Sequence, residues 1–390
     1  MRAYFQRKPK DAVFISFFLY ALSLGTLFPR LGDLQTKMDI DKATLGLALI
    51  GLPLGVQITL LFADRIVRKF KFRLVLMTGI PLLGISQVVV ALSEGPYTFA
   101  AILMLGGAAI AIIEVAVNLE ADRVEAHIGH RIMNRSHAYW SFGFFGAGIL
   151  GAGFSQLGIS PFSHFALITV LSSVLTILLF AKYDAAKARR QSLVEKNKGF
   201  VWPSKGIFLL VFFSLSAMLV EGASIDWSVI FMRDIFNTVP LVSGLSLALA
   251  AIAQGIIRYF ADQFVDKYGP ERVSIYSLIA MVLGVGCVVF SFEPVTALLG
   301  FLLMGGGSAV IFPLAMSAAA RRIDKTPEEN VASLAQFVFV IFLLAPPILG
   351  FVGEHAGLRW SFALCFPLLI ISFFTIHSLS VQIDDKKNAY

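Results

Sequence analysis

Four ionisable residues lie within long apolar stretches of this 390-residue chain: Glu114, Glu221, Asp226 and Arg258. A charged side chain at the centre of a membrane helix costs on the order of 2.5–3.5 kcal/mol or more, so each of them is a candidate functional residue. A carboxylate that faces a partly hydrated cavity can exchange a proton near neutral pH. We therefore predict Glu221 as the first candidate for proton or substrate binding and Glu114 as the second. A structural ion pair is the alternative for both.

Uncharged polar residues in the same stretches are candidates for a solute cavity. Asn118 follows Glu114 by four residues, so the two share a helix face. Three glutamines, Gln57, Gln87 and Gln254, lie near the middle of their stretches when about 1.5 Å of helix rise is allowed per residue. We predict that these side chains and Glu221 line the cavity. Interhelical hydrogen bonding is the alternative, because helices that are apolar nearly all round show no preferred face.

A short charged sequence occurs twice, as FADRIVRK over residues 62–69 and as FADQFVDK over residues 260–267. Each copy ends a long apolar stretch, which is typical of duplicated membrane halves. The residues predicted to form a conformational latch here are Asp64, Arg65, Arg68, Arg258 and Asp262. Arg258 and Asp262 are one helical turn apart, so we expect them to pair. Asp226, near the end of its own stretch, is expected to pair with Arg30.

The composition is that of an integral membrane protein. Hydrophobic residues make up 57% of the chain and charged residues 15%, whereas soluble domains contain about 25% charged residues. Each of twelve apolar stretches is long enough to cross about 30 Å of hydrocarbon as a helix. They cover residues 12–31, 43–62, 73–93, 97–119, 136–158, 162–181, 206–231, 241–261, 273–291, 295–319, 331–352 and 358–380. The sequence thus predicts an all-α membrane protein with twelve transmembrane helices.

The basic residues indicate the orientation of the chain. Most of the 32 Lys and Arg residues lie in the two termini and in alternate loops. The positive-inside rule places both termini in the cytoplasm, and the net charge of +7 then requires no nucleic-acid partner. The longest polar stretch, residues 182–205, is predicted to be a cytoplasmic linker between two six-helix bundles, residues 1–181 and 206–390.

Several classes of site are not expected. Cys287 and Cys365 both lie in apolar stretches, where a lone thiol behaves as a small hydrophobe, and no metal site or cofactor is predicted. Residues 146–151 match GxGxxG, but they lie in a glycine-rich membrane stretch without a βαβ unit, so helix packing is the interpretation. The chain also lacks the P-loop, HExxH and GxSxG motifs. We expect neither ATP-driven transport nor an enzyme.

Twelve stretches, a central linker and paired charged turns resemble the major facilitator superfamily. The turn at residues 63–69 is similar to the superfamily signature between helices two and three, with Leu60 and Val67 where glycines are usual. Three further groups of segments resemble the MosC-like branch, bacterial carriers related to fucose permeases. They are residues 29–31 with 45–49, residues 114–118 with 137–141, and residues 221–228.

This resemblance implies a monomeric secondary carrier in a bacterial inner membrane, built from two six-helix bundles that alternate access to a central site. It implies a small polar, sugar-like solute and proton coupling. The antiporter signature of helix five contains a proline, and residues 143–153 of this chain contain none. The absence of this signature favours symport. Efflux of amphipathic compounds is one alternative, in keeping with 36 Phe residues. A membrane receptor or scaffold that transports nothing is another.

Overall fold

The computed structural model describes residues 8–186 and 202–380. Within these ranges every regular element is a helix, which confirms the predicted all-α class. Eleven helices or joined helices are long and apolar enough to cross a membrane. A further helix, α8 (Met133–Gln156), has 24 residues but is not among these eleven. The described residues therefore form a multi-pass membrane protein, and the predicted number of twelve spans depends on α8.

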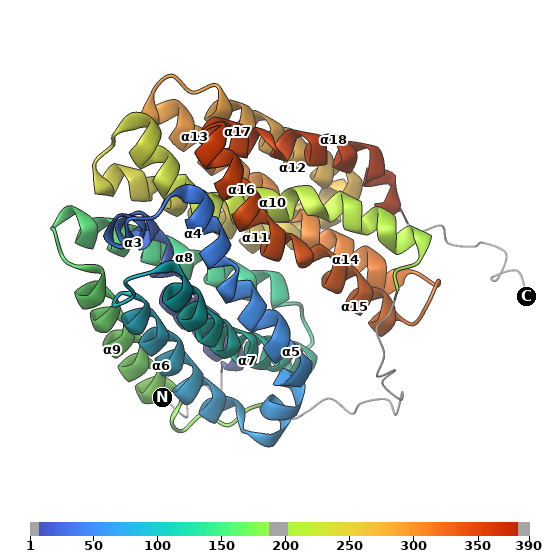
Figure 1. The fold of residues 1–390 in the computed structure, drawn as a ribbon. Helices are drawn as coiled ribbons and strands as arrows, with labels where there is room; N and C mark the ends of the chain where they lie inside the picture. Colours follow the sequence, from blue (N-terminus) through green and yellow to red (C-terminus); the bar gives the residue numbers. More distant parts are fainter. Residues whose placement is uncertain (1–7, 187–201, 381–390) are drawn as a thin grey trace, which may run out of the picture.

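The helices fall into a first group from the N-terminal part of the chain and a second group from the C-terminal part. The two groups lie mainly in different regions of the molecule (Figure 1). The first group contains α2 (Pro9–Gly25), the 3₁₀ helix η1 (Phe28–Arg30), α3 (Leu31–Met38), α4 (Lys42–Leu49), α5 (Gly51–Lys69), α6 (Phe72–Val90), α7 (Pro96–Ile128), α8 and α9 (Pro161–Phe180).

The second group begins after the predicted linker, most of which lies outside the described residues. It contains α10 (Lys205–Phe236), α11 (Pro240–Tyr268), α12 (Pro270–Val289), α13 (Pro294–Ser308), α14 (Ile311–Arg321), α15 (Pro327–Val338), α16 (Val340–His355), α17 (Leu358–Ala363), α18 (Cys365–Thr375) and the 3₁₀ helix η2 (Ile376–Leu379).

Side chains at the helix starts satisfy backbone N–H groups that have no partner within the helix. The Ser204 side chain caps α10 by accepting from the backbone N–H of Ile207 in its first turn, and Thr326 forms a capping box with Glu329 at the start of α15. Ser204 also donates to Asp324 at 2.6 Å. This bond, and then the neighbouring Arg322, hold the pKa of Asp324 below its usual value. These contacts fix the connection between α14 and α15.

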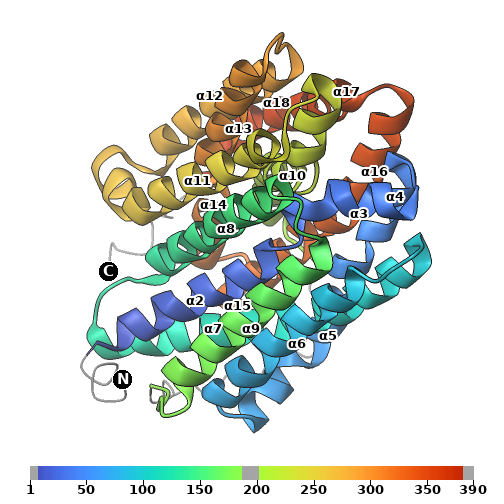
Figure 2. The ribbon, with the colours of Figure 1, turned by 90° about the vertical axis from the view of Figure 1, so that its left-hand side faces the viewer.

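Helices α8 and α11 pack closely along their length, and we call this contact the α8–α11 seam (Figure 2). Small residues make it close: a Cβ atom on Gly148 would lie 3.3 Å from the backbone nitrogen of Ala248. Gly244 meets Ala152 in the same way farther along the seam. Small residues at a helix contact let the backbones approach each other, as is common in membrane proteins. The seam is thus a direct contact between the first and second groups.

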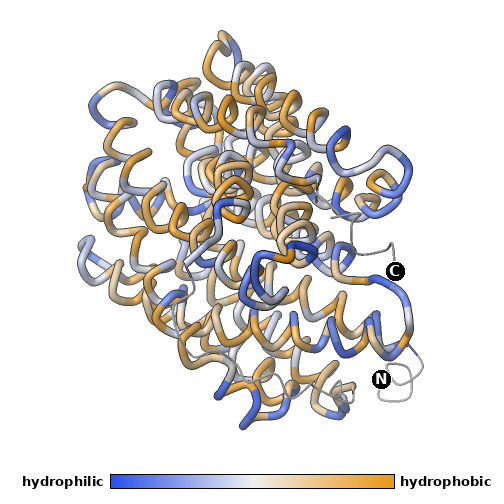
Figure 3. Tube along the Cα trace, turned by 90° about the vertical axis from the view of Figure 1, so that its right-hand side faces the viewer, coloured by the Kyte–Doolittle hydropathy of each residue, from blue (hydrophilic) through white to orange (hydrophobic). Residues whose placement is uncertain are grey.

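The loops lie at two ends of the helices, and hydrophilic segments gather there while hydrophobic segments fill the length between (Figure 3). We call one end the basic face, formed by residues 69–71, 129–132, 181–186, 269 and 322–326. The other end, the opposite face, is formed by residues 39–41, 91–95, 157–160, 237–239, 290–293 and 356–357.

Candidate functional site

A cavity of about 280 Å³ lies between the two helix groups. Helices α5, α7 and α8 contribute to its lining from the first group, and α10 and α16 from the second. Its polar lining residues are Gln57, Glu114, Glu221 and Asp226. A small cavity of about 20 Å³ shares Glu221 with it and adds Gln254. The structure thus brings four predicted site residues and Asp226 into one region between the groups.

Glu221 belongs to a buried polar network. Its Oε2 atom pairs with Arg258 Nη2 at 3.2 Å, so α10 is tied to α11. Arg258 also donates from Nη1 to Ser141 Oγ at 3.2 Å and from Nε to the carbonyl of Ala309 at 3.2 Å. Ser141 in turn donates to Gln254 Oε1 at 2.9 Å. Because Ser141 belongs to α8, this network also joins the first group to the second.

The other two carboxylates in the lining differ in their partners. Asn118 donates to Glu114 Oε1 at 2.9 Å. In the described part of the chain, Asp226 makes no hydrogen bond or ion pair. Those residues also provide no group of three His, Cys, Asp or Glu that could hold a metal ion. Asp226 is therefore the one lining carboxylate that has no hydrogen-bond donor and no positively charged partner among the described residues.

Two expected ion pairs are not formed. Arg258 points into the interior toward Glu221, and Asp262 instead accepts from Asn134 on α8 at 2.6 Å. Spacing along one helix could not reveal this, because both actual partners come from other helices. Arg30 pairs with Asp33 at 2.5 Å and donates to the carbonyl of residue 159 at the opposite face. Asp226 lines the cavity instead of meeting Arg30.

The remaining candidates lie in different surroundings. Gln87 is buried and donates to the carbonyl of Leu24 at 3.1 Å, which is the interhelical alternative to a cavity position. Arg65 and Arg68 are exposed at the basic face. The side chain of Asp64 lies outside the described residues, so its latch role stays a prediction. Asp262 bridges α11 to α8 at this face, as a latch residue would.

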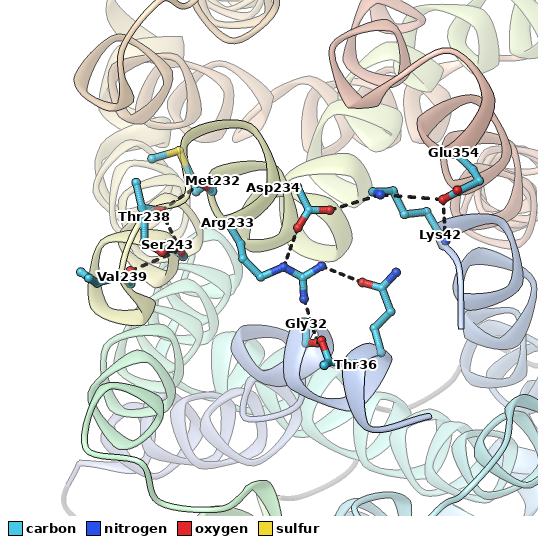
Figure 4. A network of polar contacts seen from close by, with 11 residues as sticks. Gly32, Thr36, Lys42, Met232, Arg233, Asp234, Thr238, Val239, Ser243 and Glu354 are labelled. Carbon is cyan, nitrogen blue, oxygen red and sulfur yellow. Dashed lines mark hydrogen bonds and ion pairs between the residues drawn. The ribbon is translucent and has the colours of Figure 1, made fainter. Parts of the chain in front are cut away.

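A polar network spans the two groups at the opposite face (Figure 4). Arg233 on α10 donates from Nη1 to the carbonyl of Gly32 and from Nη2 to Gln35 Oε1, both at 2.8 Å. Its Nε donates to Asp234 at 2.6 Å. Gly32 and Gln35 belong to α3, so two of these three bonds cross from the second group to the first.

Lys42 extends the network from the first group. Its Nζ atom lies 3.3 Å from Asp234 Oδ2 and 3.7 Å from Glu354 Oε2. Beside it, a Cβ on Gly46 would lie 3.1 Å from the carbonyl carbon of Pro346, so α4 and α16 are in close contact. We define the opposite-face network as Gly32, Gln35, Lys42, Arg233, Asp234 and Glu354; it joins the two helix groups at that face.

Aromatic residues of both groups form the walls of the cavity, which the sequence did not reveal. They are Phe28, Trp140, Phe144, Phe339 and Phe342. The rings of Trp140 and Phe144 lie 4.3 Å apart between centroids. The aromatic segment over residues 139–145, set between small residues, is the only sequence signal that pointed to this wall.

Comparisons with known proteins agree with this arrangement. The sequence model described as Major Facilitator Superfamily matches residues 13–342 and 209–389. An uncharacterized MFS-type transporter of Yersinia pestis is 27% identical over 364 residues, which are 92% of each chain. Membrane protein MosC of Rhizobium meliloti is 24% identical and is matched over 89% of this chain and 84% of its own length.

Solved structures share the fold. A D-xylose-proton symporter superposes with a TM-score of 0.75 at 12% identity, over 95% of this chain and 97% of its own. The nucleoside transporter NupG superposes with a TM-score of 0.70 at 14% identity, over 96% and 99%. At such identities the likeness describes the arrangement of helices alone.

Proposed function

We propose, because the chain belongs to the major facilitator superfamily, that it is a proton-coupled secondary carrier which moves a small solute by alternating access. Membership of this family indicates that the protein is a transporter rather than an enzyme. The observation that carries the finer proposal is the central cavity, which lies between the helix groups and contains Glu114 and Glu221. A site between two halves is reached from either side when the halves rock against each other.

In this proposal α8 also crosses the membrane, which brings the eleven spans to twelve. Residues 1–181 and 206–390 then form two six-helix bundles joined by the linker. The basic face lies in the cytoplasm with both termini, and the membrane is a bacterial inner membrane. The excess of Lys and Arg at one face supports this orientation, and the bacterial relatives support the location. The opposite-face network then closes the outer side, so the conformation described here is closed to the outside.

Glu221 couples the proton to the conformation. When it is ionised, it holds Arg258, which in turn reaches Ser141 across the α8–α11 seam. Protonation removes the charge of Glu221 and weakens this ion pair, so the hydrogen bonds between the two groups rearrange. Glu114 is the second proton candidate, since it lies in the same lining and is held by an uncharged partner.

Two substrate classes remain to be separated by experiment. The resemblance to the MosC-like branch favours a small polar, sugar-like solute, and one solved neighbour is a D-xylose-proton symporter. The second candidate is an amphipathic compound leaving the cell. The five aromatic residues of the cavity walls favour this class, because aromatic rings bind apolar surfaces through dispersion and burial.

Transport into proteoliposomes tests the proposal. D-Xylose and uridine represent polar solutes and ethidium an amphipathic one, and each is followed with and without an imposed proton gradient. We expect the gradient to drive accumulation of at least one class, and Glu221→Gln to abolish the effect of the gradient. Glu94→Gln is the matched control, because Glu94 is an exposed carboxylate in an opposite-face loop. Full proton-driven accumulation with an unchanged pH profile in Glu221→Gln would show that Glu221 does not carry the proton.

A further inference from the structure

The charges around the central cavity do not balance. Glu114, Glu221 and Asp226 all contribute to its lining, and none of the described lining residues is Lys, Arg or His. Arg258, bonded to Glu221, compensates one carboxylate from outside the lining. Glu114 receives a hydrogen bond from the uncharged amide of Asn118. Asp226 is left with no protein partner among the described residues.

An ionised carboxylate in a cavity of low polarity is costly unless a charge or hydrogen-bond donor meets it. A solute that carries a positively charged nitrogen removes this cost when it binds, whereas a neutral solute does not. The aromatic walls point the same way, because the face of an aromatic ring attracts a cation and Trp is the strongest of these rings. Trp140 lines the same cavity as Asp226.

The remaining polar groups are few. Glu114 and Glu221 already use part of their hydrogen-bonding capacity within the protein, whereas Gln57 and Asp226 form no hydrogen bond with the described residues. A neutral polyol needs a partner for each of several buried hydroxyl groups. A solute with one ammonium group on a compact ring or chain needs far fewer partners, and the rest of its surface can lie against the aromatic walls.

We infer that the solute bears a protonated amine, and that Asp226 is the residue that binds it. This inference rests on the proposed carrier function and specifies the charge of its substrate, whether the body of the solute is hydroxylated or apolar. Asp226 lies on α10 five residues after Glu221. The amine therefore binds beside the Glu221–Arg258 pair without replacing either member of it.

Two pairs of probes, each matched in shape, test the charge requirement on the purified full-length chain. They are cyclohexylamine with cyclohexanol, and glucamine with sorbitol, and binding is measured by calorimetry at one fixed pH. We expect at least one amine to bind about tenfold or more tighter than its neutral partner, the effect of one charge-assisted hydrogen bond. In Asp226→Asn this preference should fall to about threefold or less, as only a neutral hydrogen bond remains.

Two variants serve as controls. Asp226→Glu keeps the carboxylate and should retain most of the preference for the amine, which separates loss of charge from a general disturbance of α10. Asp39→Asn removes an exposed carboxylate at the opposite face, in a left-handed backbone position that Asn tolerates, and should leave the preference unchanged.

Three outcomes would overturn the inference: equal binding of amines and neutral partners by the wild type, an amine preference that survives in Asp226→Asn, or no binding of any of the four probes. None of them touches the carrier function, which the proton-driven accumulation of D-xylose, uridine or ethidium tests separately. Failure of both experiments would count against the carrier function itself.

Discussion

Replacing Arg233 by Gln should shift the protein toward conformations in which the opposite face is open. The side chain makes two hydrogen bonds across the helix groups, to the carbonyl of Gly32 and to Gln35, each at 2.8 Å. Hydrogen bonds from a charged donor contribute about 1.5–3 kcal/mol each. Arg233 is 34% exposed, so solvent screening reduces the sum to roughly 1–3 kcal/mol. This corresponds to a change of about 5- to 150-fold in the ratio of closed to open molecules.

Distances between spin labels measure this shift. Labels at Glu94→Cys and Phe292→Cys, after replacement of the two native cysteines, report on exposed loops of the first and second groups at the opposite face. Arg233→Gln should increase the population of long distances. Arg359→Gln is the matched control, because Arg359 donates at the same face to the carbonyl of Val289 at 2.8 Å, within the second group.

The control variant should lower the melting temperature without changing the distances between the labels. If Arg233→Gln left the distances at their wild-type values, the opposite-face network would not be what keeps that face closed. Equal opening in Arg359→Gln would also refute the reasoning, because the effect would then come from general loosening of the second group. Arg233→Lys should lie between the wild type and Arg233→Gln, since it keeps the charge but loses the planar fork that reaches two acceptors.

Three further results are expected. Asp262→Asn should slow transport while equilibrium affinity for solute stays within a few-fold, since Asp262 joins α8 and α11 at the basic face away from the cavity; loss of binding would contradict this. Gln57→Cys should react with a permeant thiol reagent and be protected by solute, whereas Gln87→Cys should stay unreactive. The bond from Ser204 lowers the pKa of Asp324. The ionised Asp324 carboxylate therefore stabilises the folded protein at neutral pH, and this stabilisation is lost as pH falls through the lowered pKa. Below about pH 4 the melting temperature of the wild type should therefore fall more steeply than that of Asp324→Asn.

The helical class and the duplicated turns could be predicted from the sequence because they depend on local composition. An uninterrupted apolar stretch of about 20 residues is typical of a membrane helix, which provides a partner for every backbone polar group within the segment itself. Glu221 and Gln57 could be selected for a related reason: a polar side chain in such a stretch needs a partner or a cavity. Gln87 met the same criterion and found its partner in the backbone of α2.

The partners and directions of these side chains could not be predicted. Arg258 has a carboxylate four residues later in its own helix, yet it pairs with Glu221, 37 residues earlier. Which carboxylate faces an arginine depends on how the helices rotate, and helices that are apolar nearly all round give no sign of their rotation. For the same reason, only the packed arrangement shows the aromatic walls and the lack of a partner for Asp226 among the described residues.

The α8–α11 seam has a consequence for how the two groups can move. Gly148, Ala152, Gly244 and Ala248 carry no side chain beyond Cβ, so this part of the seam has no side-chain rotamers that must change when the helices move. Nearer the basic face the same two helices are joined by hydrogen bonds from Ser141 to Gln254, from Arg258 to Ser141 and from Asn134 to Asp262. A change in the angle between α8 and α11 would therefore keep the small-residue contact and break the polar one. A long side chain in the small-residue part, as in Gly148→Leu, should separate the helices there and prevent this change of angle.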